Sequence, residues 1–266
     1  MSRHIRFHLP PKHPWRDRLK WFDSVGSTNT LAKEMAAQGA PHGTVLIADH
    51  QTEGRGRLGR TFHSPNAAGI YMSVILRPQC PPMQLMHLTC AVAVAVCDAV
   101  EKALGFRPSI KWINDLVVNG KKLGGILTEL SIDPKTGLTD YAVIGIGINC
   151  TQRSEDFSED IRSMACSAAM FTKKAVDRSR LAAAMITELE EMSRRLLSEK
   201  EDIMARYRQD CVTIGSHVQV LHGDEKREGM ALDVDCEGAL IVTFTDGHTE
   251  AVSCGEVSVR GMYGYT

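Results

Sequence analysis

Hydrophobic residues recur at helical spacing in three segments of the chain. The first runs from the polar cluster at residues 27–29 to Gly39, and side chains of such a cluster can accept hydrogen bonds from the free N–H groups of a helix start. The second, over residues 83–104, is strongly apolar and stops at Gly105. The third, over residues 179–209, has an apolar stripe beside a polar face. These patterns predict three helices, the last of which packs on a sheet.

Apolar runs of strand length occupy five further segments. The dipeptide Asn119-Gly120 supplies the positive φ angles of a tight hairpin turn, so the segments on either side of it should pair antiparallel. We therefore expect a mixed α/β layer and not a plain parallel sheet. The expected strands cover residues 44–49, 69–76, 109–118, 122–131 and 140–149.

Three regions of the chain differ in composition. Residues 1–20 are rich in His, Arg and Pro and lack the apolar stretch of a signal peptide, so we expect a loosely held N-terminal arm. Residues 21–211 hold the predicted elements of one large domain. From residue 212 the chain changes to short strands separated by Gly and Asp, which is typical of a small β-barrel of SH3-like size. Residues 212–266 are therefore expected to form a C-terminal domain.

Composition argues against several classes of protein. The formal net charge of -1 is unsuited to a chain that coats nucleic acid. Residues 85–104 include His, Asp, Glu and Lys, which are costly in lipid, so they predict a buried helix and no membrane span. The 8 cysteines form no CxxC pair, and several lie in apolar runs. We expect buried thiols in a reducing cytoplasm, without a zinc site or disulfides.

Residues 54–60, with the sequence GRGRLGR, place three glycines and three arginines within seven positions. Glycine lets backbone N–H groups approach an anion, and guanidinium groups form forked hydrogen bonds with phosphate or carboxylate. A solvated basic loop or an RNA-contacting segment would have the same composition. This run follows a strand and leads back into the large domain, whereas a nucleic-acid tail would be terminal and repetitive. We therefore expect a mobile loop that closes on an anionic ligand.

Polar residues also interrupt the strands beside the predicted hairpin. Asn114 and Asp115 in KWIND are unfavourable in a buried sheet unless they bind a metal, a polar ligand or a partner side chain. Lys122 in KKLGGIL is a better candidate than Lys121 to point inward, although a surface turn with an ion pair is the alternative. Residues 145–149, GIGIN, end another strand and leave room for backbone contact with a flat ligand.

Taken in order, the cluster at residues 27–29, Gln51 with GRGRLGR, KWIND, KKLGGIL and GIGIN resemble the motifs of the biotin protein ligase family over residues 22–149. The resemblance implies an α/β (α+β) fold: a seven-stranded, mixed, mostly antiparallel sheet with helices on one face, class II synthetase-like, plus a small C-terminal SH3-like β-barrel. It also implies an enzyme that forms biotinyl-5′-AMP and transfers biotin to a lysine. That lysine would belong to a biotin carboxyl carrier domain of a carboxylase or decarboxylase. The implied cofactors are ATP, biotin and Mg²⁺.

The same resemblance assigns individual residues. Lys122 would contact the biotin carboxylate and the α-phosphate, and Arg57 would close over the acyl phosphate. Asp115 would act as a Mg²⁺ ligand or as a base toward the acceptor lysine. Two positions depart from the family pattern: Phe62 replaces the usual tryptophan that stacks on adenine, and Ile113 replaces a commoner proline. The implied biotin contacts are Ser27, Thr28, Asn29, Gln51, Gly54, Arg55, Gly56, Arg57, Tyr71, Lys122, Gly124 and Gly125. The implied ATP contacts are Arg57, Arg60, Phe62, Asn114, Asp115, Lys122 and Asn149.

Three other functions compete with this hypothesis. Lipoate or octanoate ligation uses the same fold class, but the arginine-rich loop and the KLGGIL context look like the biotin branch. A biotin-responsive repressor needs a DNA-reading winged helix of about 60 residues, which the proline-broken segment before Trp21 does not accommodate. A non-enzymatic RNA-binding protein would show salt-dependent RNA affinity and no ATP turnover. We expect no DNA binding, no membrane association, and a monomer or weak homodimer.

Overall fold

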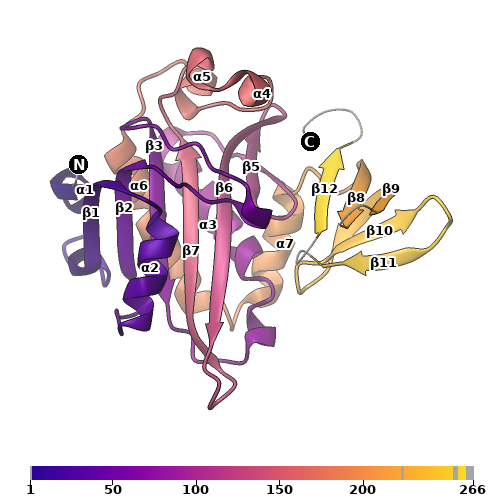
Figure 1. Cartoon of the computed structure of the whole chain (residues 1–266), viewed down its shortest axis with the longest axis horizontal. Coiled ribbons are helices and arrows are strands. Elements are labelled where there is room, and N and C mark those ends of the chain that lie inside the picture. The colour runs from indigo at the N-terminus through magenta and orange to yellow at the C-terminus, as the bar shows by residue number, and fades with distance from the viewer. Residues whose placement is uncertain (1, 223–224, 254–256, 262–266) are drawn as a thin grey trace.

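A seven-stranded mixed sheet forms the centre of the larger domain (Figure 1). In the computed structural model, which describes residues 2–222, 225–253 and 257–261, its strands run in the order β1-β2-β3-β7-β6-β5-β4. β1 and β2 are parallel, and the other neighbouring strands are antiparallel. The predicted mixed, mostly antiparallel sheet is therefore confirmed. The bounds are β1 Leu19–Val25, β2 Thr44–Gln51, β3 Gly69–Leu76, β4 Ser109–Lys111, β5 Asp115–Val118, β6 Lys121–Ile132 and β7 Thr139–Asn149.

Helices cover both faces of this sheet. The large helices α3, α6 and α7 share one hydrophobic core with Val45 and Ile47 of β2. Because side chains alternate along a strand, Leu46 points to the opposite face, where it packs with Ala32 and Ala36 of α2. The large helices thus lie on one face as predicted. The predicted helix after Ser27, α2, lies on the opposite face. The helix bounds are α1 Ser2–His8, α2 Thr28–Ala37, α3 Leu88–Leu104, α4 Glu159–Arg162, α5 Ala168–Thr172, α6 Arg178–Arg195 and α7 Lys200–Asp210.

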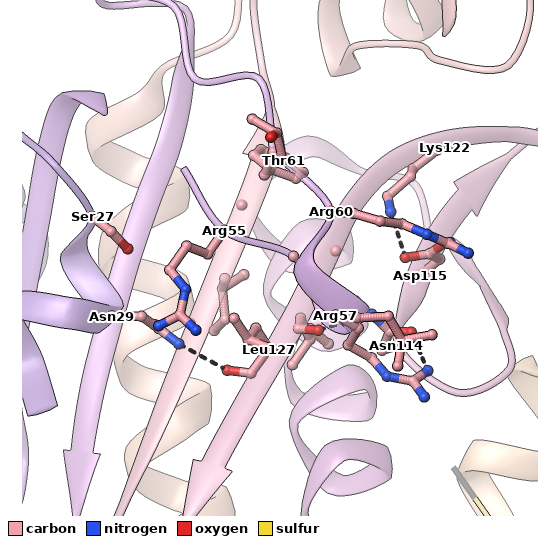
Figure 2. A pocket seen from close by; sticks show the side chains of 18 of the residues that line it. Ser27, Asn29, Arg55, Arg57, Arg60, Thr61, Asn114, Asp115, Lys122 and Leu127 are labelled. Atoms are coloured by element: carbon pink, nitrogen blue, oxygen red, sulfur yellow. Dashed lines mark hydrogen bonds and ion pairs between the residues drawn. The ribbon is translucent and has the colours of Figure 1, made fainter. Parts of the chain in front are cut away.

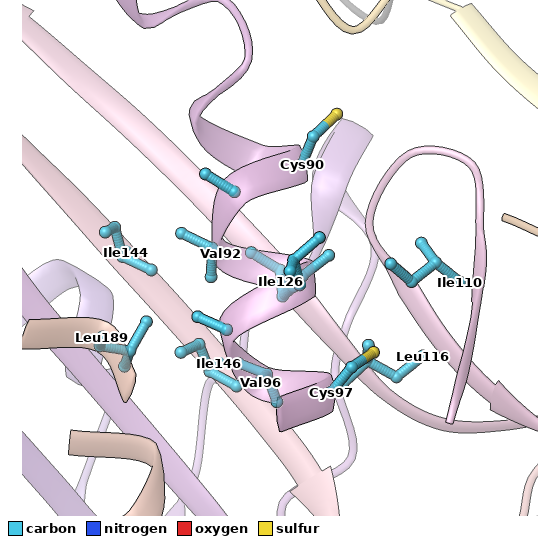
Figure 3. Close-up of a cluster of buried hydrophobic side chains, with 14 of the residues drawn as sticks. Cys90, Val92, Val96, Cys97, Ile110, Leu116, Ile126, Ile144, Ile146 and Leu189 are labelled. Atoms are coloured by element: carbon cyan, nitrogen blue, oxygen red, sulfur yellow. The ribbon is translucent and has the colours of Figure 1, made fainter. Parts of the chain in front are cut away.

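The helix α3 is the buried centre of the main core (Figure 3). Its Val92 and Val96 lie together with Ile144 and Ile146 of β7 and Leu189 of α6. Because α3 is enclosed by the sheet and by α6, it is apolar on nearly all sides, as expected for a helix without a solvent-facing side.

The segment Pro82–Leu104 is, within the described part of the chain, the one helical stretch that is long and apolar enough to cross a membrane. In the folded chain 78% of its most apolar window is buried, which is the behaviour of a core helix. Gly105 ends the helix in a left-handed conformation with φ 77°, and its N–H donates to the carbonyl of Glu101. The predicted buried helix and its stop at Gly105 are confirmed.

The predicted strand over residues 109–118 is divided in two. β4 and β5 are separate short strands that pair antiparallel with each other. The chain turns between them at Trp112, whose backbone N–H donates to Thr213 Oγ1 at 2.9 Å and whose indole N–H donates to the carbonyl of Gly238 at 2.9 Å. The two partners lie 101 and 126 residues away along the chain, so the local pattern could not indicate this turn.

The predicted helix over residues 179–209 is also divided. α6 ends at Arg195 and α7 begins at Lys200. At the break, the carbonyl of Leu196 lies 2.9 Å from Nε2 of the buried His87 side chain. The helical packing against α3 and the sheet is as predicted, but the break depends on this distant partner.

The N-terminal segment is packed more closely than its composition predicted. α1 lies against α6, and Ile5, Leu9 and Trp15 are buried in the main core. Strand β1 follows directly and begins at Leu19, within the predicted arm. The expectation of a loosely held arm was wrong because three apolar side chains in it find partners on the large domain.

The C-terminal region forms a five-stranded antiparallel sheet in the order β11-β10-β9-β8-β12. This agrees with the small β domain that the sequence predicted. Among the described cysteines, six are buried thiols outside any disulfide and Cys236 is exposed, while Cys254 lies outside the described residues. The bounds are β8 His217–His222, β9 Glu225–Val234, β10 Leu240–Phe244, β11 Thr249–Val252 and β12 Val257–Gly261.

Candidate active site

A cavity of about 450 Å³ opens between the start of α2, the loop after β2, and strands β5, β6 and β7 (Figure 2). Segments that are far apart in the sequence thus meet at one place. The cavity is lined by Ser27, Thr28, Asn29, Gln51, Arg55, Gly56, Arg57, Leu58, Arg60, Thr61, Phe62, Lys111, Trp112, Asn114, Asp115, Lys122, Gly125, Ile126, Leu127, Gly145, Ile146, Gly147 and Met164.

The start of α2 builds one end of the cavity from buried polar groups. The backbone N–H and the hydroxyl of Thr28 both donate to Gln51 Oε1, at 2.8 and 3.0 Å. Gln51 in turn donates through Nε2 to Ser64 Oγ at 2.9 Å. The Ser73 hydroxyl lies 2.8 Å from Thr28 Oγ1 and 2.6 Å from Asn29 Oδ1. This network holds donors and acceptors in fixed directions, which suits a small polar ring.

Glu129 of β6 joins this network from beside the cavity. Its carboxylate accepts from Asn29 Nδ2 at 3.0 Å and from Lys33 Nζ at 2.8 Å, and Arg55 Nη1 lies at 3.5 Å. Burial opposes ionisation of this carboxylate, but the hydrogen bonds from Lys33 and Asn29 and the nearby Arg55 charge outweigh it and hold the Glu129 pKa below its ordinary value.

The arginine-glycine loop, residues 54–60, folds over the cavity as a small hairpin. The Gly56 N–H donates to the Arg60 carbonyl at 2.7 Å, and the Phe62 N–H donates to the Gly54 carbonyl at 2.9 Å. A Cβ atom at Gly54 would lie 2.2 Å from the Phe62 carbonyl oxygen, so only glycine fits there. The loop therefore has a defined shape, while its mobility stays a prediction.

Positive charge gathers at the other end of the cavity. Lys122 Nζ lies 2.6 Å from Asp115 Oδ1, across the hairpin that the Asn119-Gly120 turn was predicted to form. Arg57 Nη1 donates to Asn114 Oδ1 at 3.2 Å, and Figure 2 shows Arg60 directed toward the Lys122 and Asp115 pair. Arg57, Arg60 and Lys122 thus line this end of the cavity together with one carboxylate, so this end suits a polyanionic ligand. The prediction that Lys122 points inward is confirmed.

The glycines of the GIGIN motif make room for protein side chains. A Cβ atom at Gly147 would lie 2.5 Å from the Phe62 ring, and one at Gly145 would lie 2.1 Å from Asn29 Oδ1. We expected this motif to leave room for backbone contact with a flat ligand. The space is instead taken by Phe62 and Asn29, which the glycines allow to approach the cavity wall.

Four predicted site residues do not line the cavity, namely Gly54, Tyr71, Gly124 and Asn149. The Tyr71 ring is fully buried behind Phe62, and its hydroxyl donates to the Pro65 carbonyl at 2.9 Å. Asn149 donates through Nδ2 to the Cys166 carbonyl at 3.1 Å. These two side chains hold neighbouring segments in place, and Tyr71 lies in contact with Phe62, which lines the cavity.

Several lining residues were absent from the predicted site. Trp112 stood within a recognised motif, and it lines the cavity at the break between β4 and β5. Met164 comes from the segment between α4 and α5, and its carbonyl accepts from the Lys122 N–H at 2.7 Å. Nothing in the local sequence around Met164 indicates this contact. Lys111, Leu58 and Thr61 likewise line the cavity without having been predicted.

Comparison with known proteins places this geometry in a family. Residues 21–149 match the biotin/lipoate A/B protein ligase family, and residues 213–260 match the biotin protein ligase C terminal domain. The biotin–[acetyl-CoA-carboxylase] ligase of Mycobacterium tuberculosis is 36% identical over 249 residues, covering 91% of this chain and 89% of that protein. The chain belongs to the biotin protein ligase family.

Further members of the biotin protein ligase family agree with this assignment. The bifunctional ligase/repressor BirA of Bacillus spizizenii is 35% identical over 244 residues, covering 91% of this chain and 74% of that protein. The solved structure of the biotin protein ligase from Aquifex aeolicus in complex with biotin and ATP has a TM-score of 0.77 and 29% identity. That match covers 91% of this chain and 98% of the other. The predicted family, fold class and ligase activity are thereby confirmed.

Proposed function

We propose that this chain forms biotinyl-5′-AMP from biotin and MgATP and then transfers biotin to a specific lysine of a biotin carboxyl carrier domain. The observation that carries the proposal is one cavity with an end of hydrogen-bonding polar groups at α2 and a cationic end at Arg57, Arg60 and Lys122. Biotin has a polar ring at one end and a carboxylate at the other, so it matches this division. The family relatives named for biotin ligation support the same substrate.

The polar end of the cavity holds the ureido ring of biotin in this proposal. Ser27, Thr28 and Asn29 stand at the start of α2, and Gln51 fixes Thr28 by two hydrogen bonds. Because the partners of these groups are set before biotin arrives, the ring meets oriented donors and acceptors. Arg55 and Gly56 of the arginine-glycine loop then cover the bound biotin.

The cationic end brings two anions together. The first half-reaction forms a bond between a biotin carboxylate oxygen and the α-phosphorus of ATP, and pyrophosphate leaves. Lys122 and Arg57 neutralise both anions and the charge that develops between them. Arg60 contacts the phosphates from the loop, and Phe62 offers its ring to the adenine, where a smaller ring than tryptophan gives a weaker stack.

Asp115 is suited to Mg²⁺ that arrives with the nucleotide. Of the described residues that line the cavity, Asp115 alone carries a carboxylate, and no group of three or more His, Cys, Asp or Glu side chains gathers there. Mg²⁺ binds through one or two carboxylates together with substrate phosphates and water, so one carboxylate is an adequate donor set. When bound, the ion would neutralise phosphate charge, while Asn114 would contact the triphosphate from the adjacent position.

In the second half-reaction the neutral amine of the acceptor lysine attacks the acyl carbonyl, and AMP leaves. Asp115 could also take the proton of that amine, and Asp115→Asn separates its two tasks. If the carboxylate serves only the metal, D115N slows adenylate formation and leaves transfer from preformed biotinyl-5′-AMP unchanged. If it is the base, transfer slows as well.

The decisive experiment is mass spectrometry of a purified biotin carboxyl carrier domain incubated with the chain, biotin and MgATP. A gain of one biotinyl group on one lysine is the expected result, and Lys122→Ala serves as the inactive control. An unmodified acceptor together with no biotin-dependent exchange of pyrophosphate into ATP would refute the proposal.

Lipoate ligation is the nearest alternative, because the family model for residues 21–149 includes lipoate ligases. The match of residues 213–260 to a biotin protein ligase C terminal domain favours biotin. Lipoate added in excess should therefore leave biotinyl-5′-AMP formation unchanged.

The proposal extends to location and partners. We place the enzyme in the cytoplasm, where the six buried thiols of the described residues would stay reduced. The acceptor would belong to a biotin-dependent carboxylase or decarboxylase. We expect a monomer or weak homodimer that does not bind DNA, in keeping with the net charge of -1 and with α1 packed against α6. Sedimentation and a gel shift with duplex DNA test these two points.

A further inference from the structure

Glu129 is an acidic side chain that the mechanism above does not use. It stands on β6 two residues beyond Leu127, so its side chain points to the same face of the sheet as that cavity-lining residue. Its side chain is 23% exposed, and its carboxylate is approached by three side chains from two segments, the helix α2 and the arginine-glycine loop. The partners are Asn29 Nδ2 at 3.0 Å, Lys33 Nζ at 2.8 Å and Arg55 Nη1 at 3.5 Å.

These three partners have different places around the cavity. Asn29 lines the polar end, Arg55 belongs to the loop above, and Lys33 lies one helical turn further along α2. One cation would be enough to balance one carboxylate. The ion pair with Lys33 could therefore balance the charge of Glu129 by itself. The further contacts of Glu129 connect Asn29, in the cavity wall, to Arg55, in the loop over the cavity.

The arginine-glycine loop is held by two side chains, one on each side of Gly56. Arg55 extends toward Asn29 and Glu129, whereas Arg57 donates to Asn114 on the turn between β4 and β5 (Figure 2). With both arginines held, Gly56 stays over the cavity. Loss of either contact would free one side of the loop.

We propose that Glu129 is a positioning residue, whose carboxylate holds the Arg55 side of the arginine-glycine loop over the cavity and sets the direction of the Asn29 amide. Because Nδ2 of Asn29 is bound to Glu129, its Oδ1 faces the Ser73 hydroxyl at 2.6 Å. Glu129 itself does not line the cavity. It acts through Arg55 and Asn29, and the effect on adenylate retention rests on the function proposed above.

Limited trypsin cleavage of the ligand-free protein tests the loop contact without using any activity. Glu129→Gln keeps the side-chain length and every arginine but removes the charge that attracts Arg55. Because exposed and partly exposed ion pairs contribute up to about 1 kcal/mol, we expect cleavage within residues 54–60 to be roughly two- to fivefold faster. Fragments identified by mass spectrometry report the position of the cut. Unchanged cleavage in the loop would overturn the proposal.

A matched control separates this effect from a general loss of stability. Glu188 of α6 pairs with Lys102 at 2.8 Å, the same kind of pair and the same distance as Glu129 with Lys33. Glu188→Gln should leave loop cleavage at the wild-type rate. Faster cleavage of E129Q at sites throughout the chain would show global unfolding and would count against a local role.

Retention of biotinyl-5′-AMP tests the consequence for the site. E129Q and Arg55→Ala should each speed escape of the adenylate, and the double variant should be no faster than the faster single one, because both changes break one contact. Lys33→Gln removes the other cation and should retain adenylate as wild type does. Multiplied effects in the double variant would refute action through Arg55.

The two proposals fail in different ways. If the wild-type chain forms no biotinyl-5′-AMP, the proposed function fails, while the trypsin experiment still tests the contact between Glu129 and the loop. If the adenylate forms normally and E129Q changes neither cleavage nor retention, only the role of Glu129 is refuted.

Discussion

Replacing Lys122 by alanine tests the electrostatic basis of the proposed chemistry most directly. In the structure, the Lys122 ammonium lies 2.6 Å from Asp115 Oδ1 at the cationic end of the cavity, and the two side chains are 31% and 17% exposed. The substitution removes a positive charge from the place where carboxylate and α-phosphate must meet. It also leaves the Asp115 carboxylate facing the phosphates without this partner.

The expected loss follows from Coulomb's law in a partly solvated site. Two unit charges about 4 Å apart interact by about 4 kcal/mol at an effective dielectric constant of about 20. Since Lys122 is partly exposed, we take about 3–4 kcal/mol, which corresponds to a roughly 100- to 1000-fold lower rate of adenylate formation. Loss of the partner of Asp115 should lower the free energy of unfolding by about 1–2 kcal/mol in addition.

The assay is biotin-dependent exchange of pyrophosphate into ATP, with urea unfolding to show that the variant is folded. Lys121→Ala is the matched control, because Lys121 is the preceding residue on β6 and does not line the cavity. It should retain nearly the wild-type exchange rate. A folded K122A variant with exchange within tenfold of wild type would remove Lys122 from the chemistry.

Three further predictions concern other parts of the molecule. Arg57→Ala removes the contact with Asn114 Oδ1 at 3.2 Å. Since charge-assisted hydrogen bonds contribute about 1.5–3 kcal/mol, biotinyl-5′-AMP should escape at least about tenfold faster, as measured by rapid gel filtration. Retention at the wild-type level would contradict the role of Arg57 in closing the loop. Trp112→Phe leaves the Gly238 carbonyl without its indole donor, so urea unfolding should show a free energy of unfolding lower by about 1–2 kcal/mol, and the KM for ATP should rise. An unchanged KM would show that this contact with the C-terminal domain does not affect ATP binding. Burial holds the pKa of His87 below its ordinary value of 6.5, so as pH falls the unfolded chain takes up this proton first and the free energy of unfolding should decrease below about pH 6.5. His87→Gln should reduce that decrease between about pH 7.5 and 5.5, and an identical pH dependence would exclude His87 as its source.

Some residues of the site could be predicted from sequence motifs, and others could not. Arg57, Asp115 and Lys122 meet in one cavity as their motifs indicated, because the two strands that carry Asp115 and Lys122 are joined by a turn of strong local preference. Glu129 could not be recognised in the same way. Its importance comes from Asn29 and Arg55, which lie 100 and 74 positions away and approach it only in the folded chain.

By itself the sequence determined those features whose cause is local. These are the strand at Gly69–Leu76, the hairpin turn at Asn119-Gly120, the helix after Ser27 and the end of α3 at Gly105. At Asn119-Gly120 and Gly105 a positive φ angle acts on the immediate neighbours, and in the strand and the helix the spacing of apolar residues does. The predicted capping hydrogen bond of Ser27 is not formed, and the Thr28 N–H donates to Gln51 Oε1 instead. Only the tertiary structure decided the turn at Trp112, the break between α6 and α7, and which face of the sheet α2 covers. Those features depend on hydrogen bonds and apolar contacts whose energy is set by distance in space, which sequence separation does not reveal.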